Sequence, residues 1–190
     1  MQPTNRRLIV VDDEPGVLDA YRVVFSQATS SVSPRIQSSR SHVEREAMPA
    51  NPNDKSEPNA PSAVSGKAQH GRLPVFEVTF CTSGEEVLEK IREGLDSGCP
   101  YVGGFFDVKL GGGIDGIETI RRAQIMDPQI LVCIVSAYQD RSLEEIAKIF
   151  GEDFDGQWDF MMKPFNRMEI LQKANNLVTN WEWRRTRTAA

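Results

Sequence analysis

The sequence has few of the residues on which disulfide-built or zinc-bound proteins depend. Its 190 residues include three cysteines and two histidines. Cys81, Cys99 and Cys133 are odd in number and far apart, so neither a disulfide framework nor a zinc site is indicated. Each cysteine is expected to be a small buried or half-buried apolar residue in a reducing compartment. No cysteine accompanies His42 or His70, and both are interpreted as solvated loop residues rather than metal ligands.

Long apolar runs and net positive charge are also lacking. No stretch approaches the ~20 apolar residues of a membrane-spanning helix, and the first seven residues contain no apolar segment of signal-peptide length. The net charge of −5 gives nucleic-acid phosphates no general attraction, although it is compatible with a local basic patch. We therefore expect a soluble cytoplasmic protein that does not contact membranes and does not bind nucleic acid through this domain.

One segment lacks a sustained apolar period. Residues 28–73 are rich in Ser, Pro, Asn and Ala, a composition that buries too little apolar area to offset chain entropy. The sequence therefore predicts one domain, residues 1–183, interrupted by a disordered insert at 28–73. The basic end, 184–190, is expected to be a linker to an output domain, with an interface or a frayed tail as alternatives.

What the sequence does contain is an alternation of strands and helices. Apolar strands are predicted at 8–11, 75–80, 101–107, 130–135 and 158–162, and an amphipathic helix follows each of them. Helix starts are indicated by Pro15, Ser83 with Glu86, Asp115, Ser142 with Glu145, and Asn166 with Glu169. This alternation predicts an α/β fold, a doubly wound parallel sheet of flavodoxin-like order 2-1-3-4-5 with five helices.

Acidic residues stand where two of these strands end. Asp12 and Asp13 follow the first strand, and Asp107 ends the third. Because ligands of open α/β sheets bind at the carboxyl ends of strands, these acids are expected to converge at the switch point between the first and third strands. Ser136 and Lys163, at the ends of the fourth and fifth strands, would border the same cleft. A simpler alternative is that Asp107 only caps the turn that follows it.

Three carboxylates at one site repel one another unless a cation neutralises them. Oxygen ligands suit Mg²⁺ or Mn²⁺, which also accept phosphate oxygens. Lys163 and Ser136 would supply a charge and a hydrogen bond to a phosphoryl group. With Asp107 as the nucleophile, the product would be an aspartyl phosphate.

Taken together, these motifs resemble the receiver (CheY-like) domain of bacterial two-component response regulators. The resemblance implies that Asp107 is the phosphoacceptor and that Asp12, Asp13, Asp107 and the backbone carbonyl of Lys109 hold the metal. It implies a phosphohistidine donor on a sensor histidine kinase or a histidine phosphotransfer protein. It also implies a regulator, which catalyses only its own phosphorylation and dephosphorylation, rather than an enzyme.

The resemblance further implies a switching mechanism. The Lys163-Pro164 bond should be cis, and phosphorylation should draw Ser136 inward and let Phe160 rotate. This would remodel the face of the fourth helix, fifth strand and fifth helix, which could contact an output domain, a protein target or a second copy in a homodimer.

Two features depart from the pattern of the family. Gly111–Gly113 replaces the usual proline after the phosphoacceptor, and a more flexible loop is expected there. The insert at 28–73 is foreign to the core of the family.

The resemblance also places Lys109 and Tyr138 at positions that, in the family, flank the path of the hydrolytic water. A long cation and a bulky ring there should obstruct that water, so slow autodephosphorylation is predicted. The alternative is that both are ordinary solvent-facing side chains.

Two other functions agree less well with the sequence. A Mg²⁺-dependent phosphohydrolase with an Asp nucleophile ranks second, because such enzymes place a second acid two residues after the nucleophile, where this chain has Lys109. A flavodoxin-like flavin binder is disfavoured, because an acidic mouth repels the phosphate of the cofactor.

Overall fold

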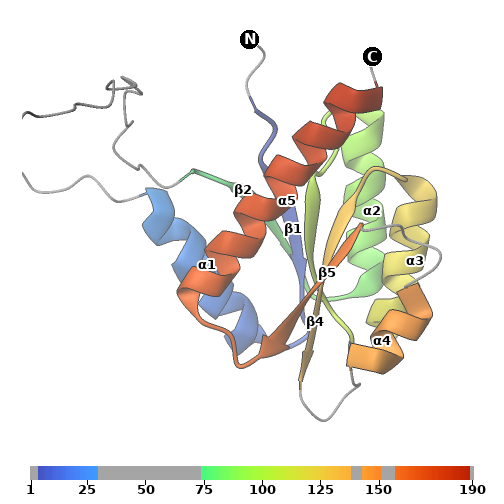
Figure 1. Cartoon of the computed structure of the whole chain (residues 1–190). Coiled ribbons are helices and arrows are strands. Elements are labelled where there is room, and N and C mark those ends of the chain that lie inside the picture. The colour runs from blue at the N-terminus through green and yellow to red at the C-terminus, as the bar shows by residue number, and fades with distance from the viewer. Residues whose placement is uncertain (1–3, 30–73, 138–142, 151–156, 189–190) are drawn as a thin grey trace, which may run out of the picture. The chain divides into compact units, whose positions relative to one another are not determined.

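The computed structural model describes residues 4–29, 74–137, 143–150 and 157–188. Within these ranges strands and helices alternate along the chain (Figure 1). The strands are β1 (Arg7–Val11), β2 (Glu77–Cys81), β3 (Gly103–Asp107), β4 (Leu131–Ala137) and β5 (Trp158–Lys163). The helices are α1 (Pro15–Thr29), α2 (Gly84–Asp96), α3 (Gly116–Met126), α4 (Leu143–Phe150) and α5 (Arg167–Thr188). All of them belong to one compact unit, residues 1–30 with 73–190.

The strands form one parallel sheet in the order β2-β1-β3-β4-β5, as the sequence predicts. β1 pairs with β3 and β3 with β4 in a register that sets Val11 beside Phe106 and Asp107 beside Val135. β4 in turn sets Ala137 beside Lys163 of β5. The carboxyl ends of β1, β3, β4 and β5 therefore meet along one edge of the sheet.

Helices cover both faces of the sheet, α1 and α5 on one and α2, α3 and α4 on the other (Figure 1). Each face has its own apolar core. Phe105 of β3 packs with Tyr21 of α1 and Leu177 of α5, whereas Phe106 packs on the opposite face with Ile120 of α3. Because successive side chains of a strand alternate between faces, β3 is buried on both sides and fixes where Asp107 emerges.

Side-chain caps begin three helices where the sequence predicts them. The Ser83 hydroxyl accepts from the backbone N–H of Glu86 (3.2 Å) at the start of α2, and Asn166 accepts from Glu169 (3.0 Å) at the start of α5. Asp115 caps α3 in the same way, accepting from Glu118 (2.8 Å). Such caps satisfy backbone donors that the first helical turn leaves unpaired. The predicted cap Ser142 lies outside the described residues.

Three expectations need correction or restriction. Cys81 and Cys133 are buried, but Cys99 is exposed, because it lies in the turn that follows α2 rather than in a strand. α1 continues through Thr29, two residues into the predicted insert, the rest of which lies outside the described residues. α5 continues through Thr188, so the predicted tail is helical for most of its length.

No helix in the described ranges is long and apolar enough to cross a membrane.

Candidate functional site

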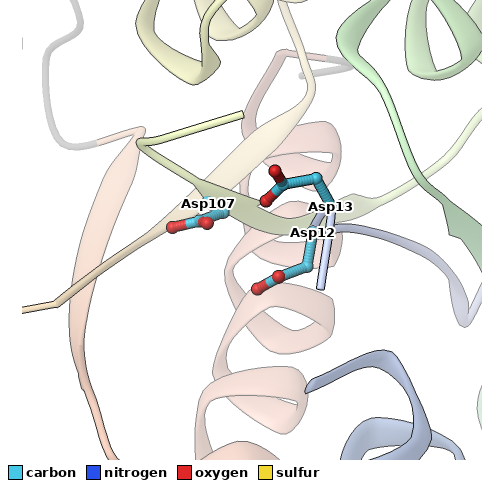
Figure 2. A group of neighbouring side chains, drawn as sticks. All are labelled: Asp12, Asp13 and Asp107. Carbon is cyan, nitrogen blue, oxygen red and sulfur yellow. The ribbon is translucent and has the colours of Figure 1, made fainter. Parts of the chain in front are cut away.

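Three carboxylates from two neighbouring strands meet at the carboxyl edge of the sheet. Asp12 and Asp13 directly follow β1, and Asp107 is the last residue of β3. One oxygen from each lies within 4.8 Å of the others, and Figure 2 shows the three side chains side by side. Asp12 and Asp107 are buried, whereas Asp13 is exposed. The predicted convergence of these acids at the switch point is therefore confirmed.

A lysine from the fifth strand joins the carboxylates. Lys163 ends β5, and its Nζ lies 2.7 Å from Asp12 Oδ2 and 3.1 Å from Asp107 Oδ2. The peptide bond from Lys163 to Pro164 is cis, as the resemblance implies. The ammonium group therefore bridges two buried carboxylates, and neither acid acts as a simple turn cap alone.

Burial dominates the electrostatics of this site. It raises the pKa of Asp107 to about 6, against the opposing charge of Lys163 and with a further contribution from the charge of Asp12. It also raises the pKa of Asp12, although Lys163 partly opposes the shift. Burial would lower the pKa of Lys163, but its contacts with the two acids outweigh that effect and raise it. The site thus holds more negative charge than one ammonium group neutralises.

The residues present fit a hard divalent cation. Asp107 Oδ1 is buried and has no hydrogen-bond partner among the described residues. An orphaned buried carboxylate oxygen is costly unless something satisfies it. Three clustered carboxylates with one such oxygen match the oxygen ligands that Mg²⁺ prefers. The backbone carbonyl of Lys109 remains a predicted fourth ligand.

The glycine-rich loop after β3 is anchored at two points. The Gly111 N–H donates to Asp13 Oδ2 (2.9 Å), and the Ile114 N–H donates to Glu85 Oε1 (3.0 Å). Gly113 has a φ of +105°, and a Cβ there would lie 2.5 Å from Glu85 Oε1. Gly113 therefore lets the loop approach Glu85 closely, in addition to giving the loop the flexibility expected from the sequence. The role of Glu85 was not predicted, because its place between Ser83 and Glu86 indicates only the start of a helix.

The other predicted residues surround the site, and the backbone of Lys109 hydrogen-bonds to Asp107, which partly opposes the rise in the pKa of that acid. Ser136 is buried on β4, and its hydroxyl donates to the carbonyl of Ala137 (3.2 Å) rather than to a carboxylate. Phe160 is partly buried and packs on the core beneath α2, α3 and α4. Lys109 is exposed. Tyr138 lies outside the described residues.

No protein family model and no curated protein matches the sequence. Solved structures do match its fold. The adenylate cyclase structure from Rhodopirellula baltica has a TM-score of 0.62 and 18% identity, over 97% of this chain and 96% of that one. A CheY-like response regulator receiver domain protein from Methanospirillum hungatei JF-1 has a TM-score of 0.58 and 18% identity, over 94% and 98%.

A response regulator receiver protein from Sinorhizobium medicae WSM419 has a TM-score of 0.56 and 16% identity, over 92% of this chain and 95% of that one. At such identities the likeness concerns the fold. This chain has the flavodoxin-like fold of CheY-like receiver domains, with the same five-stranded parallel sheet and five helices.

Proposed function

We propose that this protein is a phosphoacceptor signalling switch that receives a phosphoryl group on Asp107 and changes its contacts with a partner in response. The observation that carries the proposal is the Lys163 ammonium group, which bridges buried Asp12 and Asp107 beside a third carboxylate. A structural ion pair needs one acid. Three acids and one lysine at the carboxyl edge of a parallel sheet instead suit transfer of a highly charged group.

The chemistry of the transfer follows from the acid at the end of β3. An ionised Asp107 oxygen attacks the phosphorus atom of the donor, which is a phosphohistidine in a kinase or phosphotransfer protein. The new O–P bond forms while the P–N bond breaks, and the imidazole leaves with the electron pair of that bond. The product is an aspartyl phosphate, a mixed anhydride.

The surrounding residues act on charge and position. Lys163 lies 3.1 Å from Asp107 Oδ2 and would form a salt bridge with the incoming phosphoryl group. Asp12, Asp13 and Asp107, with the Lys109 carbonyl, would hold Mg²⁺ or Mn²⁺. The bound metal supplies neutralisation of the phosphoryl oxygens. Lys109 and Tyr138 would slow hydrolysis of the product by obstructing water.

The output of the switch is proposed for the face formed by α4, β5 and α5. Ser136 and Phe160 would move in response to the phosphoryl group, since they lie on β4 and β5 beside the site. Met162 of β5 and Met168 of α5 are 43% and 67% exposed, which supports contact of these two elements with a partner. The partner would be an output domain, a protein target or a second copy of the chain.

Incubation with Mg²⁺ and acetyl phosphate tests the proposal. Intact-mass measurement should show one added phosphoryl group per chain, absent in Asp107→Asn and absent when EDTA replaces Mg²⁺. Asp127→Asn is the matched control, because Asp127 is also a buried acid with a pKa raised by burial but lies after α3, away from the site. Labelling that survives Asp107→Asn, or multiple-turnover phosphate release, would refute the switch and favour the hydrolase.

A further inference from the structure

A second concave site lies at the opposite edge of the sheet from the carboxylates. It is a pocket of about 310 Å³, bordered by the last turns of α5, by Gln129 in the connection to β4, and by Gln157 just before β5. Residues that precede parallel strands lie at the amino edge of the sheet, whereas Asp12 and Asp107 lie at the carboxyl edge. The pocket shares no lining residue with the phosphoacceptor site, so the two sites are separate.

The charge of the pocket is opposite to that of the whole chain. Arg184, Arg185 and Arg187 line it, and none of its described lining residues is acidic. The net charge of the chain is −5. Glu182, on the same helix, lines a neighbouring hollow that shares Trp181 and Arg185 with this pocket. Arg185 and Arg187 give this part of the surface a local positive charge that attracts anions.

Two of the arginines are held in place by indole rings. The Arg185 guanidinium lies 4.5 Å from the ring centroid of Trp181, and that of Arg187 lies 4.5 Å from the centroid of Trp183. In the described part of the chain, neither arginine forms an ion pair. A stacked guanidinium keeps its N–H edge available and loses less entropy when it binds an anion. Such planar donor forks match phosphate oxygens.

Aromatic and amide groups complete the pocket. Trp183 is 57% exposed, so part of its indole surface is available to a ligand. Trp181 is buried, and its Nε1 has no hydrogen-bond partner among the described residues. The amide nitrogen of Gln157 donates to the Pro128 carbonyl (3.0 Å), which leaves the amide oxygen as an acceptor. These groups suit a ligand that has a planar ring with polar edges. Inorganic phosphate has no such ring.

We propose that this pocket binds a nucleoside diphosphate or triphosphate. Arg185 and Arg187 contact the phosphates, Trp183 stacks on the base, and Gln129 and Gln157 bind its polar edge. The volume of about 310 Å³ is at the lower end of the range for small-ligand pockets, which favours a ligand of nucleotide size. This function is independent of phosphoryl transfer to Asp107.

Calorimetric titration of the full chain with ADP and with GDP, in EDTA, tests the proposal. EDTA prevents a metal from bridging the nucleotide to the carboxylates. At least one nucleotide should bind with a Kd below ~1 mM, more tightly than pyrophosphate. The double variant Arg185→Gln/Arg187→Gln should weaken binding at least about tenfold. Trp183→Leu should weaken nucleotide binding about fivefold or more and pyrophosphate binding less, because it removes both the stacking surface for the base and the ring that holds Arg187.

Arg167→Gln is the matched control, because Arg167 is an exposed arginine at the other end of α5. It and Asp107→Asn should bind nucleotide as the wild type does, and unchanged melting temperatures would show that all variants fold. The proposal is overturned if no nucleotide binds at millimolar concentration, or if pyrophosphate binds as tightly and Trp183→Leu has no effect. Tighter binding of oligothymidylate or polyglutamate at these arginines would also overturn it, in favour of a nucleic acid or an acidic protein.

Discussion

At the scale of single residues, Lys163 is what allows two buried carboxylates to lie side by side. Replacing it by alanine leaves Asp12 and Asp107 without their shared counter-charge. Removing one partner of a buried pair costs about 3–5 kcal/mol, and protonation of an acid would relieve part of that. We therefore expect Lys163→Ala to lower the free energy of unfolding at pH 7 by about 2–4 kcal/mol, measured by urea titration without metal.

Lys173→Ala is the control for this measurement. Lys173 also forms an ion pair, 2.6 Å from Asp159, but the side chain of Asp159 is 42% exposed. Pairs with an exposed partner contribute about 0–1 kcal/mol. If Lys163→Ala cost no more stability than Lys173→Ala, the ammonium group would not be the counter-charge that the site requires.

The pKa of Asp107 predicts how stability depends on pH. Burial raises that pKa to about 6, above the ~3.9 of an unfolded chain. An acid that binds its proton more tightly when folded contributes stability that is fully present below about pH 4 and is lost as the pH rises through 6. In EDTA, the wild type should therefore lose up to about 3 kcal/mol across this window relative to Asp107→Asn.

Metal should remove this dependence, because a divalent cation favours the ionised acid. Denaturant titrations at several pH values, with and without Mg²⁺, provide the check. Equal pH slopes for the wild type and Asp107→Asn in EDTA would contradict the electrostatic description of the site.

Most of the site residues could be predicted because the ends of parallel strands must meet at one edge. Asp12, Asp107 and Lys163 follow apolar runs, so their convergence is encoded in the chain itself. Contacts that depend on rotamers could not be predicted in this way. The hydroxyl of Ser136 donates to Ala137, and no periodicity in the sequence indicates that choice.

At the scale of elements, the loop from β3 to α3 is coupled to α2 through Glu85. Its carboxylate accepts from Ile114, while Asp13 holds Gly111 in the same loop. We expect Glu85→Ala to accelerate hydrogen exchange at the Ile114 amide and to weaken Mg²⁺ binding several-fold, because the loop helps to orient Asp13. Exchange by NMR and calorimetry measure the two effects.

Glu86→Ala is the matched control for this loop. Its carboxylate lies in the same turn of α2 but accepts from Thr82 (2.8 Å), outside the loop. It should leave Mg²⁺ affinity unchanged. An equal loss of affinity in both variants would mean that Glu85 acts only through the stability of α2.

The start of α3 packs closely against the end of β3, the strand that ends in Asp107. A Cβ on Gly116 would lie 1.8 Å from the Asp107 carbonyl oxygen, which is backbone and cannot yield. Gly116→Ala should therefore destabilise the protein by at least about 2 kcal/mol and lower Mg²⁺ affinity. Gly16→Ala in α1 is the control, since a Cβ there meets nothing within 4 Å, and it should change stability by no more than about 1 kcal/mol. If Gly116→Ala and Gly16→Ala lowered the melting temperature by similar amounts, α3 would not position Asp107.

Element types and starts were predictable because their signals are local. Apolar runs, caps and helical stripes lie within a few residues of one another, and the caps of α2, α3 and α5 form as expected. The contact between Glu85 and Ile114 joins segments 29 residues apart. The continuation of α5 to Thr188 was missed because its last turns carry arginines and no apolar stripe. Their stacking on Trp181 and Trp183 appears only once the helix is formed.

At the scale of the whole molecule, the described residues on either side of the predicted insert form a five-stranded sheet with an apolar core on each face. Among the described residues, the strands, the helices and both apolar clusters lie in residues 7–29 and 76–188. β2 is an edge strand, so the connection from α1 reaches the sheet at its border, whereas the acids lie beside β1 and β3 in its interior. We therefore predict that the phosphoacceptor site forms without the insert.

Replacing residues 31–72 by about six glycine and serine residues should leave Mg²⁺ binding and phosphorylation of Asp107 unchanged. If the insert is the flexible connection that its composition predicts, the shorter loop costs less closure entropy, and stability should rise by about 1 kcal/mol. For a domain of this size that corresponds to a Tm increase of roughly 2–4 °C. Calorimetry and intact-mass labelling of the shortened chain measure both properties. A large fall in Tm would show that the insert packs on the domain, whereas loss of labelling at unchanged Tm would show that it contributes to the site itself.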